Sequence, residues 1–465
     1  MSPRKDRAGG RGGIREAIRR RRTVFVDAWR SRLWPVPALG VVIAIVAGVA
    51  IPELDSALDA HMPRPLSAYL FGGGADAARE VLAAIATSLI TVTSLTFSLT
   101  VVTLQLASSQ YTPRLLRTFA ADRFVQRTLA VFLGTFVYAL TVLRTVRSDD
   151  AGAEFVPQIA VTVAYLLAMA SVLALVLFLG HLVRQIRIET MLRHVSSDIE
   201  DTADRMLDLL DDTPDHHFTP SPPGEAAVIT ARSSGFLVEV DEQKLLAAAV
   251  DADAVVWIDR AVGSDIVAGV PVALCWSADA AGVPLPEARL SRLRERVPAA
   301  LRIGIERTAT QDIGYGLRQI TDVVIRALSP GINDPTTAVH GLNSCSATLC
   351  KLARYRLGHR HLRDDDDALR VVIARPDWPD LLDLVCGQPQ RYGANDPEVM
   401  GRLLSLLREV AWSVVLPAHR QAIVDQLERL RTTVAGQDFV DVDRHRLDEL
   451  AGHVGDALER RWGAA

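Results

Sequence analysis

"VLAAIATSLITVTSLTFSLTVVTLQLA", residues 81–107, is a run of 27 residues without a charged side chain. As a helix it is long enough to cross about 30 Å of hydrocarbon with room for tilt. Residues 36–52 and 155–179 are also uncharged, and residues 124–143 carry a single arginine. Four such runs predict a membrane domain of four transmembrane helices over residues 36–183.

The overall composition agrees with a membrane domain joined to a polar remainder. The chain has 465 residues and a net charge of −4, and its mean hydropathy is +0.18. This length allows two or three domains. The small net charge argues against nucleic acid as a partner. The four cysteines include no Cys-x2-Cys pair, so we expect reduced thiols in a cytosolic compartment rather than zinc ligands or disulfides.

The charges flanking the four runs predict their orientation. Residues 1–35 contain eleven Lys or Arg and three acids, and residues 108–127 contain four arginines and one aspartate. The alternate loops, 53–80 and 144–155, contain more acids than bases. Because positive loops stay in the cytoplasm, both termini are predicted to be cytoplasmic. Residues 1–35 form a basic N-terminal segment that is either a lipid-surface helix or an ordinary positive flank.

The second run is unusually polar for a transmembrane helix. Its hydroxyl and amide side chains fall into two rows on opposite sides of the helix. One row lies within about 60° of the helix circumference and comprises Thr87, Thr91, Ser94, Ser98, Gln105 and Ser109. The opposite row comprises Thr93, Thr96, Thr100 and Thr103.

Two interpretations of these rows remain open. Small hydroxylated residues let membrane helices pack closely, and this explains one row well. Two opposed rows are harder to satisfy within four helices, so the second row is predicted to face a symmetry mate or water. In a ring-shaped homo-oligomer the row that begins with Thr87 would line a pore. The predicted pore-lining residues are therefore Thr87, Thr91, Ser94, Ser98, Gln105 and Ser109. Arg114 and Arg117 would then form a basic collar at the cytoplasmic mouth, although the positive-inside rule alone also explains them.

The rest of the chain is predicted to form a cytoplasmic α+β region. Residues 184–224 are expected to form a membrane-proximal helix and a linker, and residues 225–284 a small β domain. Strand and turn order in that domain resembles a barrel-sandwich hybrid, the fold of biotinyl and lipoyl carriers. Its only lysine, Lys244, lies in a helical stretch, so no prosthetic group or other cofactor is expected. Residues 285–465 are predicted to be a helical domain.

Candidate catalytic and metal-binding residues are few. The phosphate-loop, serine-hydrolase, zinc-protease and dinucleotide-binding motifs are missing, so we expect no catalytic residues. An enzyme acting on a lipid or nucleotide through Asp312, Asn333 and Asp334 is a weaker alternative. His359 and His361 with the aspartates at 364–367, or the pair His216 and His217, could hold a metal ion, but solvated loops explain both groups better.

The sequence "SPGINDP", residues 329–335, has a partial repeat in "GANDP", residues 393–397. In each, an aspartate precedes a proline and a helical run. Asp at the N-cap and Pro at the first helical position are a favoured helix start. Asp334 and Asp396 are therefore predicted to be structural N-caps rather than parts of an active site.

Three stretches carry a resemblance to a known family. They are "VTSLTFSLTVVTLQLASSQYTPRLLRTF", "FLGTFVYALTVLRTVR" and "QDIGYGLRQITDVVIRALSPGINDPTTAVHGL". Together they resemble a bacterial family of predicted integral membrane proteins, domain-of-unknown-function family 2254, over about residues 20–440. The resemblance implies a multi-pass inner-membrane protein with four spans and a cytoplasmic C-terminal region. It implies no activity and no functional residues.

These observations favour an oligomeric inner-membrane ion channel or other transport conduit. The second transmembrane helix would line its pore, and the cytoplasmic domains would form a vestibule or gate. The alternative is a membrane-anchored sensor or scaffold that binds a cytosolic protein partner. Membrane lipid and further copies of the chain are the expected partners in the first case, and neither case requires enzymatic activity.

Overall fold

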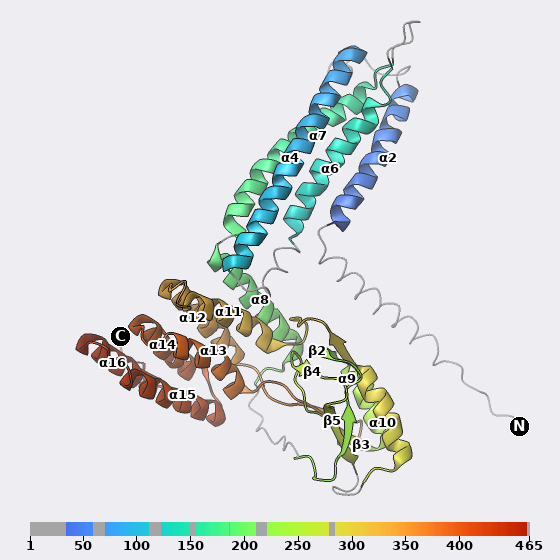
Figure 1. Cartoon of the computed structure of the whole chain (residues 1–465). Coiled ribbons are helices and arrows are strands. Elements are labelled where there is room, and N and C mark those ends of the chain that lie inside the picture. The colour runs from blue at the N-terminus through green and yellow to red at the C-terminus, as the bar shows by residue number, and fades with distance from the viewer. Residues whose placement is uncertain are drawn as a thin grey trace, which may run out of the picture. The chain divides into compact units, whose positions relative to one another are not determined.

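The computed structural model describes residues 34–58, 70–110, 122–147, 155–185, 187–210, 221–278 and 284–462, with only the backbone given for 106–110 and Gln185. The chain divides into two compact units, Met1–Arg187 and Ile188–Ala465, which we call the membrane unit and the C-terminal unit (Figure 1). The division lies close to the predicted end of the membrane domain at residue 183.

The membrane unit contains the four predicted apolar helices. They are α2 (Pro35–Leu58), α4 (Ala75–Gln110), α6 (Arg123–Leu143) and α7 (Gln158–Gln185). Each contains a segment of at least 21 residues that is apolar enough to cross a membrane. The prediction of four membrane helices is confirmed at this level, and α4 extends beyond the uncharged run at both ends.

Helix α6 lies at the centre of the membrane unit. Of its most apolar window 56% is buried, against 22–28% for the other three helices, and α2, α4 and α7 all pack against it. The approach of α2 to α6 depends on small residues at intervals of four. A Cβ atom on Gly48 would lie 2.8 Å from Thr141 Cβ, and one on Gly40 would lie 3.0 Å from the Ala130 carbonyl oxygen. Such spacing allows close backbone contact between membrane helices.

Two carboxylates connect the ends of these helices. Near the end of α2, buried Asp55 accepts a hydrogen bond of 2.9 Å from the Ile159 backbone N–H, at the start of α7. At the opposite end of α7, His181 Nε2 lies 2.6 Å from Asp122 Oδ2. Asp122 also caps α6 by accepting from the Phe124 N–H at 2.7 Å. Both carboxylates thus accept hydrogen bonds from backbone N–H groups at the starts of helices. The count of charged residues in the loops did not indicate this role.

The C-terminal unit contains a mixed sheet and an antiparallel sheet. The first has five strands in the order β1-β5-β3-β8-β7, and the second has three in the order β4-β2-β6. Helices α9 (Glu242–Ala252) and α10 (Glu287–Ala300) accompany them. The strands are β1 (Ala227–Thr230), β2 (Gly235–Val240), β3 (Ala254–Ile258), β4 (Asp265–Ile266), β5 (Pro271–Ser277), β6 (Leu301–Gly304), β7 (Arg360–Arg363) and β8 (Leu369–Ile373).

The sheets extend past the predicted end of the β domain at residue 284. Strand β6 pairs with β2, and β8 pairs in parallel with β3. Three strands, β6, β7 and β8, therefore come from residues 285–465, the segment that was predicted to be a helical domain. They are four or five residues long. The partners of β6 and β8, which are β2 and β3, are distant in sequence, whereas β7 forms a hairpin with β8. Local hydrophobic periodicity does not reveal such pairings.

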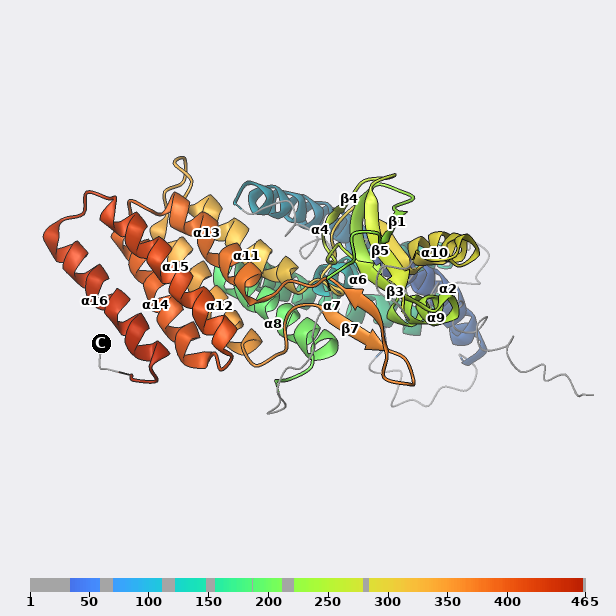
Figure 2. The same cartoon turned by 90° about the horizontal axis from the view of Figure 1, so that it is seen from below.

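The remaining helices form the other part of the C-terminal unit, and Figures 1 and 2 show α11–α16 gathered beside one another. Helix α11 is mostly buried and packs against α8, α12 and α13. A Cβ on Gly316 would lie 2.2 Å from Ile199 Cγ1 of α8, so this glycine allows the two helices to approach. The helices are α8 (Ile188–Met206), α11 (Ile313–Ala327), α12 (Pro335–Leu352), α13 (Trp378–Tyr392), α14 (Pro397–Ser413), α15 (Pro417–Ala435) and α16 (Asp441–Leu458).

Candidate functional site

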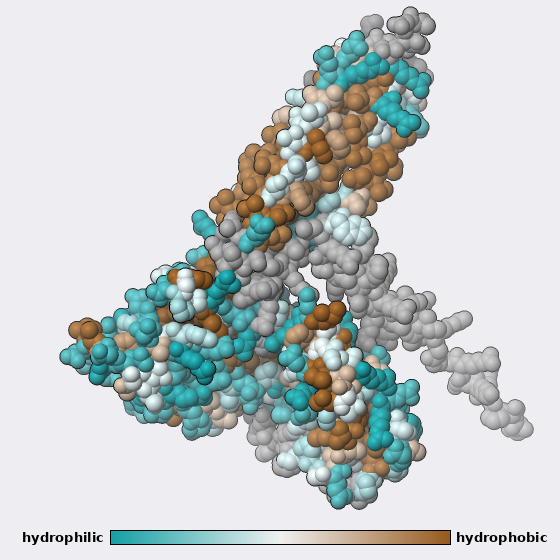
Figure 3. All heavy atoms as spheres, in the orientation of Figure 1, coloured by the Kyte–Doolittle hydropathy of each residue, from teal (hydrophilic) through white to brown (hydrophobic). Residues whose placement is uncertain are grey.

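The two polar rows of α4 have opposite surroundings in the membrane unit. Side chains of one row are buried, with exposed fractions of 0–9% for Thr93, Thr96, Thr100 and Thr103. Side chains of the other row are exposed: Thr87, Thr91, Ser94, Ser98 and Gln105. In Figure 3 a pale band of intermediate hydropathy crosses the brown surface of the membrane unit. We call these five exposed residues the hydroxyl face.

The buried row is accounted for by helix packing. Thr93 donates to the Leu89 carbonyl at 2.6 Å, and Thr100 donates to the Thr96 carbonyl at 2.8 Å. Thr103 makes the same bond to Leu99 at 2.8 Å. These hydroxyls satisfy their donors within α4 and place small side chains against neighbouring helices. The packing interpretation therefore explains three of the four hydroxyls without a ligand, while the buried Thr96 Oγ1 has no hydrogen-bond partner among the described residues.

The hydroxyl face is not covered by another described helix of the chain. Thr91 donates to the Thr87 carbonyl at 3.0 Å. This bond satisfies the hydroxyl donor, and the Thr91 side chain remains exposed. Apolar side chains lie along both edges of the face: Ile90, Leu95, Phe97, Val101 and Val102 are 36–57% exposed. The protomer thus presents a polar strip between apolar strips on the surface of its membrane unit.

Several predicted site residues fall outside the described part of the chain. The side chain of Ser109 is one, and Arg114 and Arg117 of the predicted cytoplasmic mouth are two more. His216, His217 and most of the basic N-terminal segment also lie outside it. The interpretations of these residues stay predictions.

Asp334 and Asp396 both occupy helix N-caps. Asp334 accepts from the Thr337 N–H at 3.0 Å. Asp396 accepts from the Glu398 and Val399 N–H groups, each at 2.9 Å. The following prolines begin α12 and α14, as the repeated sequence predicts. Hydrogen bonding from Thr337 lowers the pKa of Asp334.

The three residues of the enzyme alternative do not form one site. Asp312 immediately precedes α11, whereas Asn333 and Asp334 follow it. Helix α11 has 15 residues and is therefore about 22 Å long. The Asp334 carboxylate is occupied by its own helix start, so this grouping has no geometric support.

Asp312 instead takes part in a buried ion pair that the sequence did not indicate. Its Oδ2 accepts from Arg307 Nε at 3.0 Å and from Nη2 at 2.7 Å, and its side chain is 2% exposed. Burial raises the pKa of Asp312, and Arg307 opposes that shift. Gly263, with φ +93°, lies against the pair, where a Cβ would approach Asp312 Oδ2 to 2.0 Å. The sequence feature that marks this pair is a single glycine in a turn, and such glycines are too common to indicate a buried ion pair.

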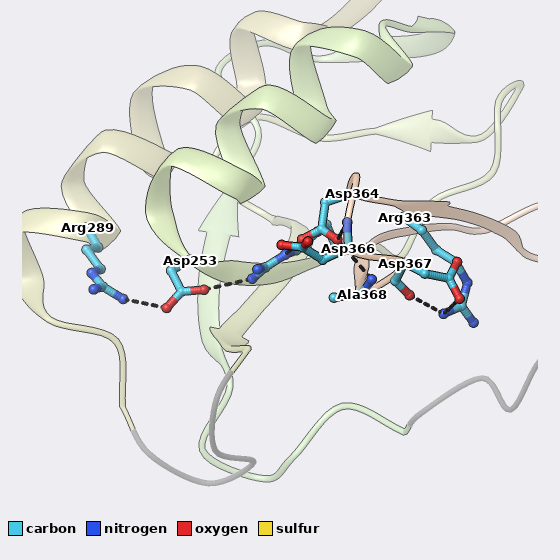
Figure 4. Close-up of polar contacts among 8 residues, drawn as sticks. Asp253, Arg289, Arg363, Asp364, Asp366, Asp367 and Ala368 are labelled. Carbon is cyan, nitrogen blue, oxygen red and sulfur yellow. Dashed lines mark hydrogen bonds and ion pairs between the residues drawn. The ribbon is translucent and has the colours of Figure 1, made fainter.

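The aspartates at 364–367 form the turn of the β7–β8 hairpin. Asp364 accepts from the Ala368 N–H at 2.9 Å and from Arg370 Nε at 2.6 Å. Arg370 also binds Asp253, which contacts Arg289 at 3.4 Å on its other side (Figure 4). These contacts are an ion-pair network between the hairpin and α10. Within the described ranges, no three His, Cys, Asp or Glu side chains gather as metal ligands.

The two candidate histidines near this turn, His359 and His361, have different neighbours. His359 packs against Trp257, with ring centroids 5.1 Å apart. His361 lies in β7 opposite Val372. Their arrangement with the aspartates is a hairpin, and it supplies no cluster of metal ligands among the described residues.

Comparisons with known proteins identify the family. A model of predicted membrane proteins, DUF2254, matches residues 30–409. Uncharacterized proteins of Mycobacterium bovis and Mycobacterium tuberculosis are each 35% identical over 453 residues, which cover 95% of this chain and 83% of theirs. No solved structure matches the chain significantly. The family match and the four apolar helices agree with the resemblance in the sequence, and the chain belongs to the DUF2254 family of predicted membrane proteins.

Proposed function

We propose that the chain is a subunit of an oligomeric conduit in the bacterial inner membrane, with a pore lined by the hydroxyl face of α4. Both termini are placed in the cytoplasm, where the C-terminal unit forms a vestibule or gate. No catalytic role is proposed for the chain.

The observation that carries the proposal is the division of the polar residues of α4. One row is buried inside the protomer, and the other, the hydroxyl face, is exposed on the membrane unit. A single hydroxyl can face lipid when it donates to its own helix, as Thr91 does. Five polar positions on one strip, including the Gln105 amide, are more stable against water or polar groups than against lipid.

The proposed conduit requires a ring of protomers. A four-helix protomer with its polar strip on the outside encloses no aqueous path, but several strips around a symmetry axis do. The exposed apolar residues at the edges of the face, such as Leu95 and Phe97, would then pack between neighbouring subunits. Uncharged hydroxyls would form the wall, and Arg114 and Arg117 would lie at the cytoplasmic mouth and favour anions.

The test is single-channel recording from purified protein in planar lipid bilayers. Ser98→Leu and Thr91→Leu replace hydroxyls of the exposed strip by bulky apolar groups, so each is expected to abolish or strongly reduce the conductance. Ala170→Leu is the matched control, because it adds similar bulk to an exposed small residue on α7. It should leave the conductance unchanged.

Absence of current from the unmodified protein would contradict the conduit. So would a current that responds equally to Ser98→Leu and Ala170→Leu, because the ions would then not pass along the hydroxyl face. Recordings in solutions of different anions and cations would also test the charge preference expected from the two arginines.

The second candidate is a membrane-anchored sensor or scaffold for a cytosolic protein, with the sheet region as a barrel-sandwich-like interaction domain. It is favoured by exposed apolar side chains near edge strand β1: Val228, Val267 and Val270 are 41–56% exposed. Deletion of 220–465 should then abolish the cellular phenotype and leave membrane insertion intact. Cross-linking in cells that captures no partner at Val267 would count against this role.

A further inference from the structure

The hydroxyl face of α4 is interrupted near its C-terminal end. Its polar positions recur every three or four residues from Thr87 to Ser98, but the next one, Gln105, follows only after seven residues. At 1.5 Å per residue this interval is about 10 Å long. The structure describes the whole interval, and its polar side chains, Thr100 and Thr103, are buried on the opposite side of the helix. The exposed strip therefore lacks the polar group that one helical turn would supply.

Two valines occupy the exposed side of α4 in this interval. With about 100° of rotation per residue, Val101 and Val102 lie about 50° to either side of the centre of the hydroxyl face. Their side chains are 36% and 48% exposed, so the rest of the described chain leaves them accessible. The surface that continues the hydroxyl face from Ser98 to Gln105 is thus made of valine methyl groups.

The interruption is confined to the exposed side of the helix. The buried row has threonines at positions 93, 96, 100 and 103, which are three or four residues apart without a gap. In the ring of protomers proposed above, the hydroxyl face of every α4 meets water. The valines of all protomers then form an apolar ring within an otherwise polar wall. Narrow apolar constrictions in channels exclude water and ions until they widen.

The side chains of this ring are rigid. Valine branches at Cβ and keeps essentially one rotamer in a helix, so rotation of the side chains does not widen the ring. Helix α4 packs against α6 and α7 through its other side. Widening therefore requires that α4 moves together with, or against, these two helices.

We propose that Val101 and Val102 form the hydrophobic gate of the conduit. This inference rests on the proposed function, because it requires that the hydroxyl face meets water. In the proposed orientation Ser98 lies on the periplasmic side of the gate and Gln105 on the cytoplasmic side. The closed gate separates the water on the two sides, and ions pass when the ring of valines widens.

The test places a cysteine on either side of the valines in the full-length protein, in a Cys350→Ser background. Right-side-out membrane vesicles are treated from outside with a charged, membrane-impermeant thiol reagent. Ser98→Cys should react rapidly. Gln105→Cys should react at least about tenfold more slowly, because its reaction follows the minor open state of the gate. Adding Val101→Thr and Val102→Thr should bring Gln105→Cys to the rate of Ser98→Cys, since threonine keeps the shape of valine and its hydroxyl admits water.

The matched control adds Val172→Thr and Val176→Thr, at two exposed valines of α7, to Gln105→Cys. These changes add the same two hydroxyls outside the hydroxyl face and should leave the slow reaction unchanged. Inverted vesicles expose Gln105→Cys to the reagent from the cytoplasmic side. Rapid reaction there establishes that the thiol is reactive and that each variant is inserted.

The outcomes separate the gate from the conduit. Equal rates at Ser98→Cys and Gln105→Cys with both valines present would overturn the gate and leave the conduit intact. A reaction of Gln105→Cys that stays slow in the threonine variant would also overturn the gate, because the barrier would then lie elsewhere. If Ser98→Cys does not react either, the hydroxyl face does not meet water, and the conduit fails together with its gate.

Single-channel recording gives a second measurement. Val101→Thr with Val102→Thr should raise the open fraction of the pore about tenfold, because each added hydroxyl hydrogen-bonds water in the constriction. Val172→Thr with Val176→Thr should leave it unchanged. An unchanged open fraction in the first variant, in a channel that Ser98→Leu still blocks, would contradict the gate.

Discussion

Aspartates at two helix starts show how surroundings set the role of a carboxylate. Asp334 lies at the start of α12, and hydrogen bonds from Thr337 lower its pKa. Asp312 lies at the start of α11, and burial raises its pKa even though Arg307 is adjacent. The N-cap role of Asp334 was readable from the adjacent proline. The ion pair of Asp312 was not, because no local pattern specifies that Gly263 and Arg307 will enclose it.

Removal of either N-cap should destabilise the C-terminal unit. Asp334→Ala and Asp396→Ala each leave first-turn N–H groups without their acceptor, at a cost of about 0.5–2 kcal/mol. Denaturant unfolding of the full-length protein in detergent measures this loss. Asp366→Ala, in the β7–β8 turn, is the control and should cost much less. Equal stability of all three variants would contradict the capping assignment.

The contribution of Asp334 should depend on pH in a defined direction. Its native pKa is lowered, so its stabilisation is complete above the unfolded value of about 3.9 and is lost as pH falls through the native pKa. Asp334→Asn does not titrate. The difference in unfolding free energy between the wild type and Asp334→Asn should therefore be constant above about pH 5 and shrink below about pH 4. A difference that grows on acidification would have the wrong sign.

Breaking the buried ion pair should cost more than removing it entirely. Arg307→Gln and Asp312→Asn each leave one charged group of the pair buried without its partner, at about 3–5 kcal/mol. The double variant leaves two neutral amides and should recover a large part of this loss. A double-mutant cycle in denaturant unfolding measures the coupling. Additive single effects would indicate that the two residues do not act as a pair.

At the scale of helices and strands, the long apolar elements were predictable and the short strands were not. The four membrane helices follow from runs of uncharged residues, because lipid requires such runs. Strands β6, β7 and β8 have four or five residues each, and they pair with β2, β8 and β3, respectively. Pairing with distant strands, rather than local sequence, made β6 and β8 extended. The predicted domain boundary at residue 284 therefore separated strands that belong to the same sheets.

Close packing of α2 on α6 predicts a sharp dependence on residue size. Gly48→Val places a branched side chain where even a Cβ would lie 2.8 Å from Thr141 Cβ, so the two helices must separate. Overpacking of this kind costs about 1–3 kcal/mol. Ala50→Val, on the exposed side of α2, is the matched control. Thermal unfolding in detergent should show a lower midpoint for Gly48→Val only, and equal midpoints would argue against the close contact.

Helix α4 illustrates how far sequence alone could reach toward the site. The two polar rows were visible from periodicity, but which row is buried depends on how α4 is rotated against α6 and α7. The structure buries Thr93, Thr96, Thr100 and Thr103 and exposes the hydroxyl face. Contacts between the helices set this rotation. A helix with polar rows on two opposite sides does not indicate from its own sequence which side is buried.

At the scale of the whole molecule, the conduit requires that several copies assemble. Native mass spectrometry or light scattering with detergent correction should find a closed oligomer of the full-length chain. Ser98→Leu lies on the pore side in this arrangement, so it should leave the subunit number unchanged. A monomer in mild detergents and in lipid nanodiscs would remove the basis for the pore.

Water exposure of the hydroxyl face is the most direct test of this account. Of the native cysteines, Cys275, Cys345 and Cys386 are buried and Cys350 is partly exposed, so a Cys350→Ser background is suitable. Ser94→Cys, Ser98→Cys and, on the exposed surface of α7, Val176→Cys are then treated in intact membranes with a charged, membrane-impermeant thiol reagent. The account predicts rapid modification at positions 94 and 98 and none at 176. Equal resistance at all three positions would mean that the hydroxyl face lies against lipid or protein, and would contradict the conduit.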